Sequence, residues 1–180
     1  MPEEELAAAL RAAQDGDAAG FATLWRGLHP NVLRYLRVLA GEHAEDAASE
    51  TWLHVIRDLH RFSGDLGSFR GWLFRIARHR GIDEKRRSSR TRETAEPPTA
   101  AAPDAEAEAA EGASTAWAVS VIAGLPVDQA EAVMLRVVAG LDVATTADIL
   151  GKRPGAVRIA TMRGLRRLAA HPQISTRQGV

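Results

Sequence analysis

No cysteine, few aromatic residues and no long apolar run occur in this sequence of 180 residues. Without cysteine, the chain can form no disulfide, no thiolate zinc site and no thiol nucleophile. None of its apolar runs approaches the roughly 20 residues that a membrane-spanning helix needs. The acidic N-terminus also lacks the apolar core of a signal peptide. We therefore expect a cytoplasmic protein that does not insert into a membrane.

The polar residues do not point to an enzyme. The six histidines are scattered and lack the spacing of a metal site such as HExxH. Asp46 and Glu50 could form a paired-carboxylate site, but one helical turn apart on an exposed face they fit a docking surface or simple solvation better. His54 could contact Glu50 in the same way, four residues away. We predict no catalytic residue, no metal and no cofactor.

The composition favours an all-α fold, because alanine, leucine, arginine and glutamate dominate and β-branched runs are scarce. Residues 91–116 contain three prolines, one arginine and six acidic residues, a net charge of −5. Such a segment can bury almost nothing, so we expect a flexible acidic linker, with a transient helix around 104–112 as an option. The linker separates two small helical domains, at 1–90 and 117–180.

The N-terminal domain is expected to be helical throughout. Asp17 should cap a helix that breaks at His29-Pro30 and resumes over 31–40. A helix over 44–59 has an apolar face of Ala48, Trp52, Val55, Ile56 and Leu59. Its other side presents Asp46, Glu50, Leu53 and Arg57. After a loop over 60–68, Ser68 should cap a last helix that runs to about Arg87, and Trp25, Trp52 and Trp117 are expected in the core.

Positive charge is concentrated in that last helix, in the stretch FRGWLFRIARHRGIDEKRR over 69–87. At 100° per residue, one side carries Phe69, Trp72, Leu73, Ile76, Ala77 and Arg80. The opposite side carries Arg70, Phe74, Arg75 and Arg78. An aromatic ring among exposed arginines suits a single strand of nucleic acid, which offers phosphates and base faces together. A merely solvated arginine face is the alternative.

The C-terminal domain has the pattern of a helix-turn-helix. Asp128 should cap a helix that Gly140 ends, and a second short helix should end at Gly151. A third helix should begin near Pro154. Its packing residues are expected to be Val157 and Leu165, against Ala147, Ile149 and Leu150 of the second helix. The third helix carries Arg153, Arg158, Arg163, Arg166 and Arg167, which favours DNA binding over a neutral bundle.

Both halves together resemble the extracytoplasmic-function group of bacterial sigma factors, within the sigma-70 family. In the first half the resemblance runs through FATLWRGLHPNVLRYL, AEDAASETWLHVIRDLHRF and SFRGWLFRIARHRGIDEKRR. In the second half it runs through LPVDQAEAVMLRVVAGLDVATTADILGKRPGAVR. The resemblance implies sigma domain 2 at 1–90 and sigma domain 4 at 117–180, with the linker in place of domain 3.

The resemblance also implies a function without catalysis: binding core RNA polymerase and directing promoter recognition and strand opening. Polymerase binding would fall to Asp46, Glu50, Leu53 and Arg57. The melted strand would be held by Arg61, Ser63, Asp65, Arg70, Phe74, Arg75, Arg78, Lys85 and Arg86. The duplex would be read by Lys152, Arg153, Ala156, Arg158, Ile159 and Arg163. The implied partners are core RNA polymerase, promoter DNA and an anti-sigma factor, which the group commonly has.

Two positions depart from the family pattern. Ser49 stands where a glutamine is common, and Ile159-Ala160 stand where a Ser-Arg pair is common. A promoter preference therefore does not follow from the resemblance. Two other functions stay open: a stand-alone helix-turn-helix repressor with an N-terminal dimerisation or sensing domain, and an adaptor that occupies polymerase without contacting DNA.

Overall fold

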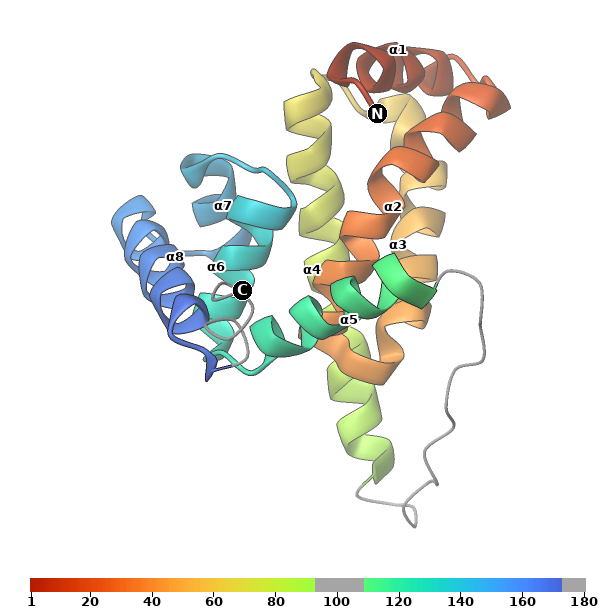
Figure 1. Ribbon diagram of the computed structural model, residues 1–180. Coiled ribbons are helices and arrows are strands. Elements are labelled where there is room, and N and C mark those ends of the chain that lie inside the picture. The colour runs from red at the N-terminus through yellow and green to blue at the C-terminus, as the bar shows by residue number, and fades with distance from the viewer. Residues whose placement is uncertain (93–108, 173–180) are drawn as a thin grey trace.

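The computed structural model describes residues 1–92 and 109–172, and in these ranges every regular element is a helix. The N-terminal half contains α1 (Glu3–Gln14), α2 (Ala18–Ala40), η1 (Gly41–His43), α3 (Ala44–Asp58), η2 (Leu59–Arg61) and α4 (Leu66–Arg92). The C-terminal half contains α5 (Ala109–Ala123), α6 (Val127–Val133), the π-helical turn η3 (Met134–Val138), α7 (Val143–Leu150) and α8 (Pro154–Ala169). Figure 1 shows α2, α3 and α4 running side by side with α1 across one end, α6 and α7 between α4 and α8, and α8 on the outer side. The predicted all-α fold with two helical domains is confirmed.

Helix α2 is continuous, so the predicted break at His29-Pro30 is wrong. Asp17 caps its start, since its carboxylate accepts hydrogen bonds from the backbone N–H groups of Ala19 and Gly20. Pro30 is exposed inside the helix and removes one backbone donor. The stripe Leu24, Leu28, Val32, Tyr35, Leu36 and Leu39 is nonetheless buried on both sides of the proline. Packing of this stripe outweighs the loss of a single hydrogen bond.

The apolar face predicted for the helix at 44–59 is mostly correct. Ala48, Trp52, Val55 and Leu59 are buried, but Ile56 is 56% exposed. The tryptophans also differ from one another: Trp52 is buried, Trp117 is partly buried, and Trp25 is exposed and stacks on His29. Spacing therefore identified the buried side of the helix but wrongly included Ile56, which lies at the margin of that side.

Helix α4 begins and ends outside its predicted limits. Asp65 caps it in place of Ser68, because its carboxylate accepts the backbone N–H of Ser68 at 2.8 Å. This backbone hydrogen bond holds the pKa of Asp65 below its usual value. The helix then continues to Arg92, into the segment predicted as linker.

The predicted linker is helical at both described ends. Residues 91–92 finish α4 and residues 109–116 begin α5, whereas 93–108 lie outside the described residues, as do 173–180. Helix α5 packs across α2 (Figure 1). Of the helical option around 104–112, residues 109–112 belong to α5, which continues to Ala123, and residues 104–108 lie outside the described residues.

The helix-turn-helix is present as α7, a short turn and α8. Asp142 caps α7 by accepting the N–H of Thr145, and Gly151 ends it in the left-handed conformation at φ 63°. Asp128 lies within the first turn of α6 rather than at its cap, which Pro126 occupies. Gly140, at φ 70°, follows η3 and ends the segment as predicted. Of the two packing residues predicted in α8, Val157 is fully buried as expected. Leu165 is exposed, so its predicted packing is wrong.

Candidate polymerase and nucleic-acid interfaces

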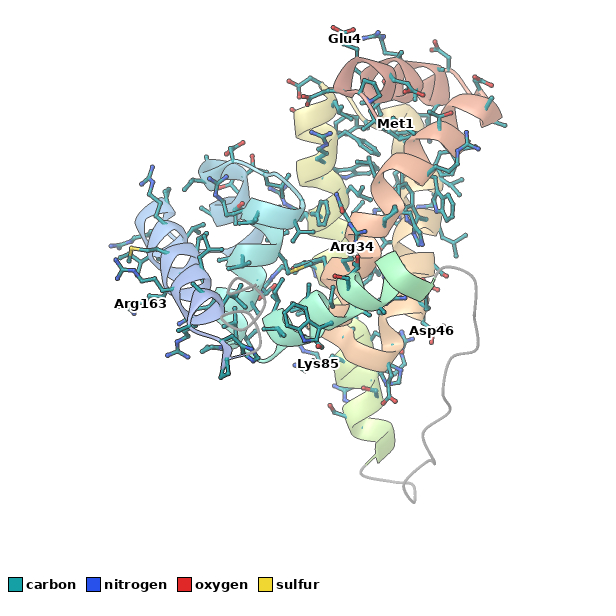
Figure 2. All side chains as sticks on the ribbon, viewed as in Figure 1. Met1, Glu4, Arg34, Asp46, Lys85 and Arg163 are labelled. Atoms are coloured by element: carbon teal, nitrogen blue, oxygen red, sulfur yellow. The ribbon has the colours of Figure 1, made fainter. Side chains whose placement is uncertain are left out.

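The outer side of α3 combines acidic and apolar groups. Asp46, Glu50, Leu53 and Arg57, the predicted docking residues, are all exposed. Leu53 is 60% exposed and Ile56 lies three residues further along, so two large apolar side chains face water on this surface. Figure 2 shows Asp46 on the side of the helical bundle away from α8. We call Asp46, Glu50, Leu53 and Ile56 the α3 surface.

Ion pairs fix the far end of α3. The Arg57 guanidinium donates to the Asp58 carboxylate at 2.8 Å, and this hydrogen bond lowers the pKa of Asp58. His54 Nε2 lies 3.2 Å from the same carboxylate. The contact of His54 is therefore with Asp58 rather than with Glu50. Arg57 is already paired within its own helix, which weakens its case as a docking residue.

The residues predicted to hold a melted strand divide into two groups. Arg61, Ser63, Asp65, Arg75, Lys85 and Arg86 are exposed, although Asp65 is engaged as the cap of α4. Arg70 is partly buried and pairs with Glu3 of α1 at 3.1 Å. Phe74 and Arg78 are turned toward other parts of the protein. The predicted strand face is therefore discontinuous in this structure.

Phe74 is a core residue, so its predicted exposure among arginines is wrong. It is 1% exposed and packs edge-on against Tyr35 of α2, with ring centroids 5.7 Å apart. Neighbouring positions on the same side of α4 face the C-terminal half: a Cβ built on Gly71 would lie 2.8 Å from Cγ2 of Thr145 in α7. The prediction from 100° spacing placed only one side of α4 in the core. In the structure other helices cover α4 on two sides, with α2 and α3 in the N-terminal half and α7 in the C-terminal half.

Arg78 is bound to a carboxylate that the sequence-based prediction missed. Its Nε donates to Glu131 Oε1 at 2.9 Å, and its Nη2 lies 3.4 Å from Glu131 Oε2. The Tyr35 hydroxyl donates to the same Oε1 at 2.8 Å. Burial and the adjacent Glu131 raise the pKa of Tyr35 well above its usual value, so it stays a donor. The signal for Glu131 was its place as the one acid among apolar residues in the stretch AEAVML, residues 130–135.

The loop before α4 is packed rather than open. Phe62 stacks on Trp72 at 5.2 Å and meets Phe69 edge-on at 5.5 Å. The amide of Gln14 donates to the Phe62 carbonyl at 2.7 Å, which ties the loop to α1. Only Arg61, Ser63 and the turn residues beside them remain available to a ligand.

Helix α8 presents the predicted duplex-reading residues. Arg153, Ala156, Arg158, Ile159 and Arg163 are exposed, and Figure 2 shows Arg163 on the outer side of the helix, away from α4. The other side of α8 packs on α6 and α7 through Val157 and Gly164. Lys152 is partly buried and pairs with Asp128 at 2.6 Å. Five of the six predicted residues are thus free to face a ligand.

One group of residues could in principle hold a cation. Within the described ranges, His43, Asp46 and Glu84 place ligand atoms within 4.8 Å of one another, a proximity that the scattered histidines did not suggest. Glu84 also pairs with Arg87 at 2.8 Å, and Asp46 is exposed. We interpret the group as a surface cluster.

Comparison with known proteins finds a family match in each half of this chain. Residues 24–91 match Sigma-70 region 2, and residues 116–168 match Sigma-70 region 4. The ECF RNA polymerase sigma factor ShbA of Streptomyces griseus is 34% identical over 179 residues, which cover 92% of this chain and 94% of ShbA. SigD of Mycobacterium tuberculosis is 33% identical over 93% of this chain and 84% of its own.

The chain belongs to the ECF group of sigma-70 factors. It is therefore an alternative sigma factor, which directs promoter recognition by RNA polymerase and binds promoter DNA. A stand-alone repressor does not carry region 2 ahead of its helix-turn-helix. In the part of this sigma factor that the structure describes, no helix has the length and apolar character to cross a membrane.

Solved structures support the same fold. The complex of CnrH with the cytosolic domain of CnrY aligns with a TM-score of 0.62 over 92% of this chain and 96% of that one, at 20% identity. The sigma factor RpoE of Bartonella quintana, solved with the anti-sigma factor NepR, aligns with a TM-score of 0.61 at 20% identity, over 83% of this chain and 94% of that one.

Proposed function

We propose that three separate surfaces of this sigma factor divide the work of initiation. The α3 surface binds core RNA polymerase. Exposed basic residues of α4 and the preceding loop hold the melted strand. The outer side of α8 reads the upstream promoter element in the major groove. The observation that carries the proposal is the outward position of the α8 arginines on a helix whose other side is packed on α6 and α7.

Polymerase binding by α3 is supported by its composition. Exposed leucine and isoleucine are costly unless a partner covers them, and charges around an apolar centre are typical of protein interfaces. Asp46 and Glu50 lie one turn apart beside Leu53 and would meet basic groups on the polymerase. Arg57 takes a smaller part, because Asp58 already satisfies its guanidinium.

Strand binding is assigned to the basic groups that remain exposed, Arg61, Arg75, Lys85 and Arg86, with Ser63 as a hydrogen-bonding group. These groups can neutralise phosphates, which accounts for most of the affinity for nucleic acid. Phe74 supplies no stacking surface while it is buried against Tyr35. Base capture would then depend on the loop residues near Ser63.

Duplex reading is assigned to Arg153, Arg158 and Arg163, with Ala156 and Ile159 close enough to make apolar contacts with base edges. An apolar contact at Ile159 suits a thymine methyl group. Lys152 is a weaker candidate, because Asp128 holds its ammonium group.

The remaining parts of the proposal concern the cellular setting. We place this sigma factor in the cytoplasm, with core polymerase and promoter DNA as partners and with no catalytic activity of its own. RpoE, which shares the fold, was solved with an anti-sigma factor, and we extend a partner of that class to this chain.

Run-off transcription with purified core polymerase over a pool of genomic promoter fragments tests the proposal. The expected result is a transcript set that requires this sigma factor and shares two promoter elements. A chain that binds duplex promoters tightly without polymerase, and yields no transcript with it, would contradict the proposal.

A further inference from the structure

The surface cluster of His43, Asp46 and Glu84 brings an imidazole and two carboxylates together from three elements. His43 ends η1, Asp46 lies in the first turn of α3, and Glu84 lies in the second half of α4. Their ligand atoms all lie within 4.8 Å of one another, and among the residues that the structure describes no second such group occurs. The group exists because α4 packs against η1 and α3, where Figure 1 shows α3 beside α4.

The imidazole of His43 is the member that a helix start does not explain. Asp46 alone would be accounted for by the favourable field at the N-terminus of α3. The Nε2 atom of His43, by contrast, is shielded from water and makes no hydrogen bond to any described residue. Oε1 of Glu42 lies 3.5 Å from it and forms an ion pair only with a protonated ring. A metal ion would give this nitrogen the partner that the protein does not supply.

The two carboxylates leave oxygen atoms open to a cation. The Glu84 side chain is only 12% exposed, and its Oε2 accepts from the Arg87 guanidinium at 2.8 Å. Its Oε1 is the oxygen left for a metal. Asp46 is exposed and can turn toward the other two groups. Two carboxylates this close repel each other, and Arg87 offsets only one negative charge, so a divalent cation would balance the cluster.

The ligand set selects the class of metal. One imidazole nitrogen and two carboxylate oxygens, in a chain without cysteine, suit a borderline divalent ion such as Zn²⁺ and disfavour Cu(I) and iron–sulfur clusters. The imidazole also disfavours Mg²⁺ and Ca²⁺, which take oxygen ligands. Zinc bonds of about 2.1 Å hold ligand atoms about 3–4 Å apart, so the three groups must close by roughly 1 Å. Rotation of the exposed Asp46 side chain supplies that movement.

We propose that His43, Asp46 and Glu84 bind one divalent metal ion of the zinc class, with water completing its coordination. The bound ion joins the start of α3 to α4. It also engages Asp46, which belongs to the α3 surface, so the metal and the polymerase compete for the same carboxylate. This competition rests on the proposed function of the α3 surface, whereas the metal site does not.

Calorimetric titration of the metal-free full chain with Zn²⁺ tests the site. One equivalent of Zn²⁺ should bind, and Mg²⁺ at the same concentrations should not. His43→Gln and Glu84→Gln should each weaken Zn²⁺ binding by about tenfold or more, since even the loss of a group that only supports a ligand costs a metal site about 10–100-fold in affinity. Circular dichroism of each variant checks that its helical content is unchanged.

Two matched controls make the same substitutions outside the cluster. Glu45→Gln changes the exposed carboxylate next to Asp46, which pairs with Arg37 at 3.3 Å, and His60→Gln changes an exposed histidine. Both should bind Zn²⁺ as the parent does. The site would be overturned by parental affinity in both His43→Gln and Glu84→Gln, by an equal loss in the controls, or by a parent that shows no saturable Zn²⁺ binding.

Binding to core polymerase, measured with and without Zn²⁺, tests the competition. Zn²⁺ should lower the affinity of the parent several-fold, and Glu84→Gln, which keeps Asp46, should remove that effect. An equal response to Zn²⁺ in the parent and in Glu84→Gln would refute the competition. If the chain with Asp46→Arg and Glu50→Arg binds polymerase as the parent does, the α3 surface fails, and calorimetry on the free chain still decides the metal site.

Discussion

Trp52 of α3 donates its indole N–H to Nδ1 of His29 in α2, over 3.1 Å. The hydrogen bond joins two helices that Phe21 and Trp52 also join edge-on. It requires His29 to be unprotonated at Nδ1, and Trp25 covers the ring at a centroid distance of 4.5 Å. Burial of the ring lowers the pKa of His29, and the nearby charges of Glu45 and Arg37 act in opposite directions.

This geometry predicts that the domain loses stability in mild acid. The folded pKa of His29 lies below its unfolded value near 6.5, so the unfolded chain binds the proton first. The free energy of unfolding should therefore decline as the pH falls from about 7 through the folded pKa, and then level off for this residue. Denaturant unfolding at a series of pH values measures it. His29→Gln should make the free energy of unfolding less dependent on pH in this range, whereas the control His60→Gln, at an exposed position, should leave the pH dependence unchanged. If the His29 variant shows the same pH dependence as the parent, His29 is not the cause of the loss in acid.

Phe74→Ala is expected to destabilise the folded chain rather than simply remove a DNA contact. Truncation of a fully buried phenylalanine costs about 3–5 kcal/mol, because the transfer free energy and a residual cavity add. Ile56→Ala, at an exposed position, should cost about 0.5 kcal/mol or less. Chemical denaturation of the two variants makes the comparison. Equal stabilities would show that Phe74 is exposed in solution.

The α3 surface should control affinity for polymerase. Asp46→Arg combined with Glu50→Arg should weaken binding to core enzyme by about tenfold or more, because like charges would then meet across the interface. Helical content should stay unchanged, since both side chains are exposed. Glu4→Arg with Glu5→Arg makes the same charge change on α1, at the other end of the bundle (Figure 2), and should leave binding intact. Co-purification of the α3 variant at the parental level would remove this surface from the proposal.

Arg158 and Lys152 should differ in their contributions to duplex binding. Arg158→Ala should cost about 1–3 kcal/mol of promoter binding and relax the base preference at one position, if the side chain is bidentate to guanine. Lys152→Ala should cost less, because Asp128 already pairs with the ammonium group at 2.6 Å. Titrations of promoter duplex with the polymerase complex at several salt concentrations separate base contacts from phosphate contacts. A larger loss in the Lys152 variant would reverse this order.

Local features of the sequence were sufficient for much of the fold. Asp17 caps a helix where its position indicated, and Gly151 ends α7 as predicted, in the left-handed conformation that glycine favours. The helix-turn-helix and its exposed arginines followed in the same way. These features depend on hydrogen bonds and backbone preferences within a few residues, so a linear sequence contains them.

The sequence by itself therefore determined most of the helices, their order and the division into two helical domains, while tertiary structure decided which sides of the helices are covered. Periodicity shows which residues share one side of a helix, but the number of neighbours around that helix depends on contacts between distant segments. Phe74 is buried because α2 and the C-terminal half meet at α4, and Ile56 and Leu165 are exposed because no described segment covers them. Glu131 lies 96 residues from Tyr35 and 53 from Arg78, so only the folded chain brings the carboxylate to its two donors.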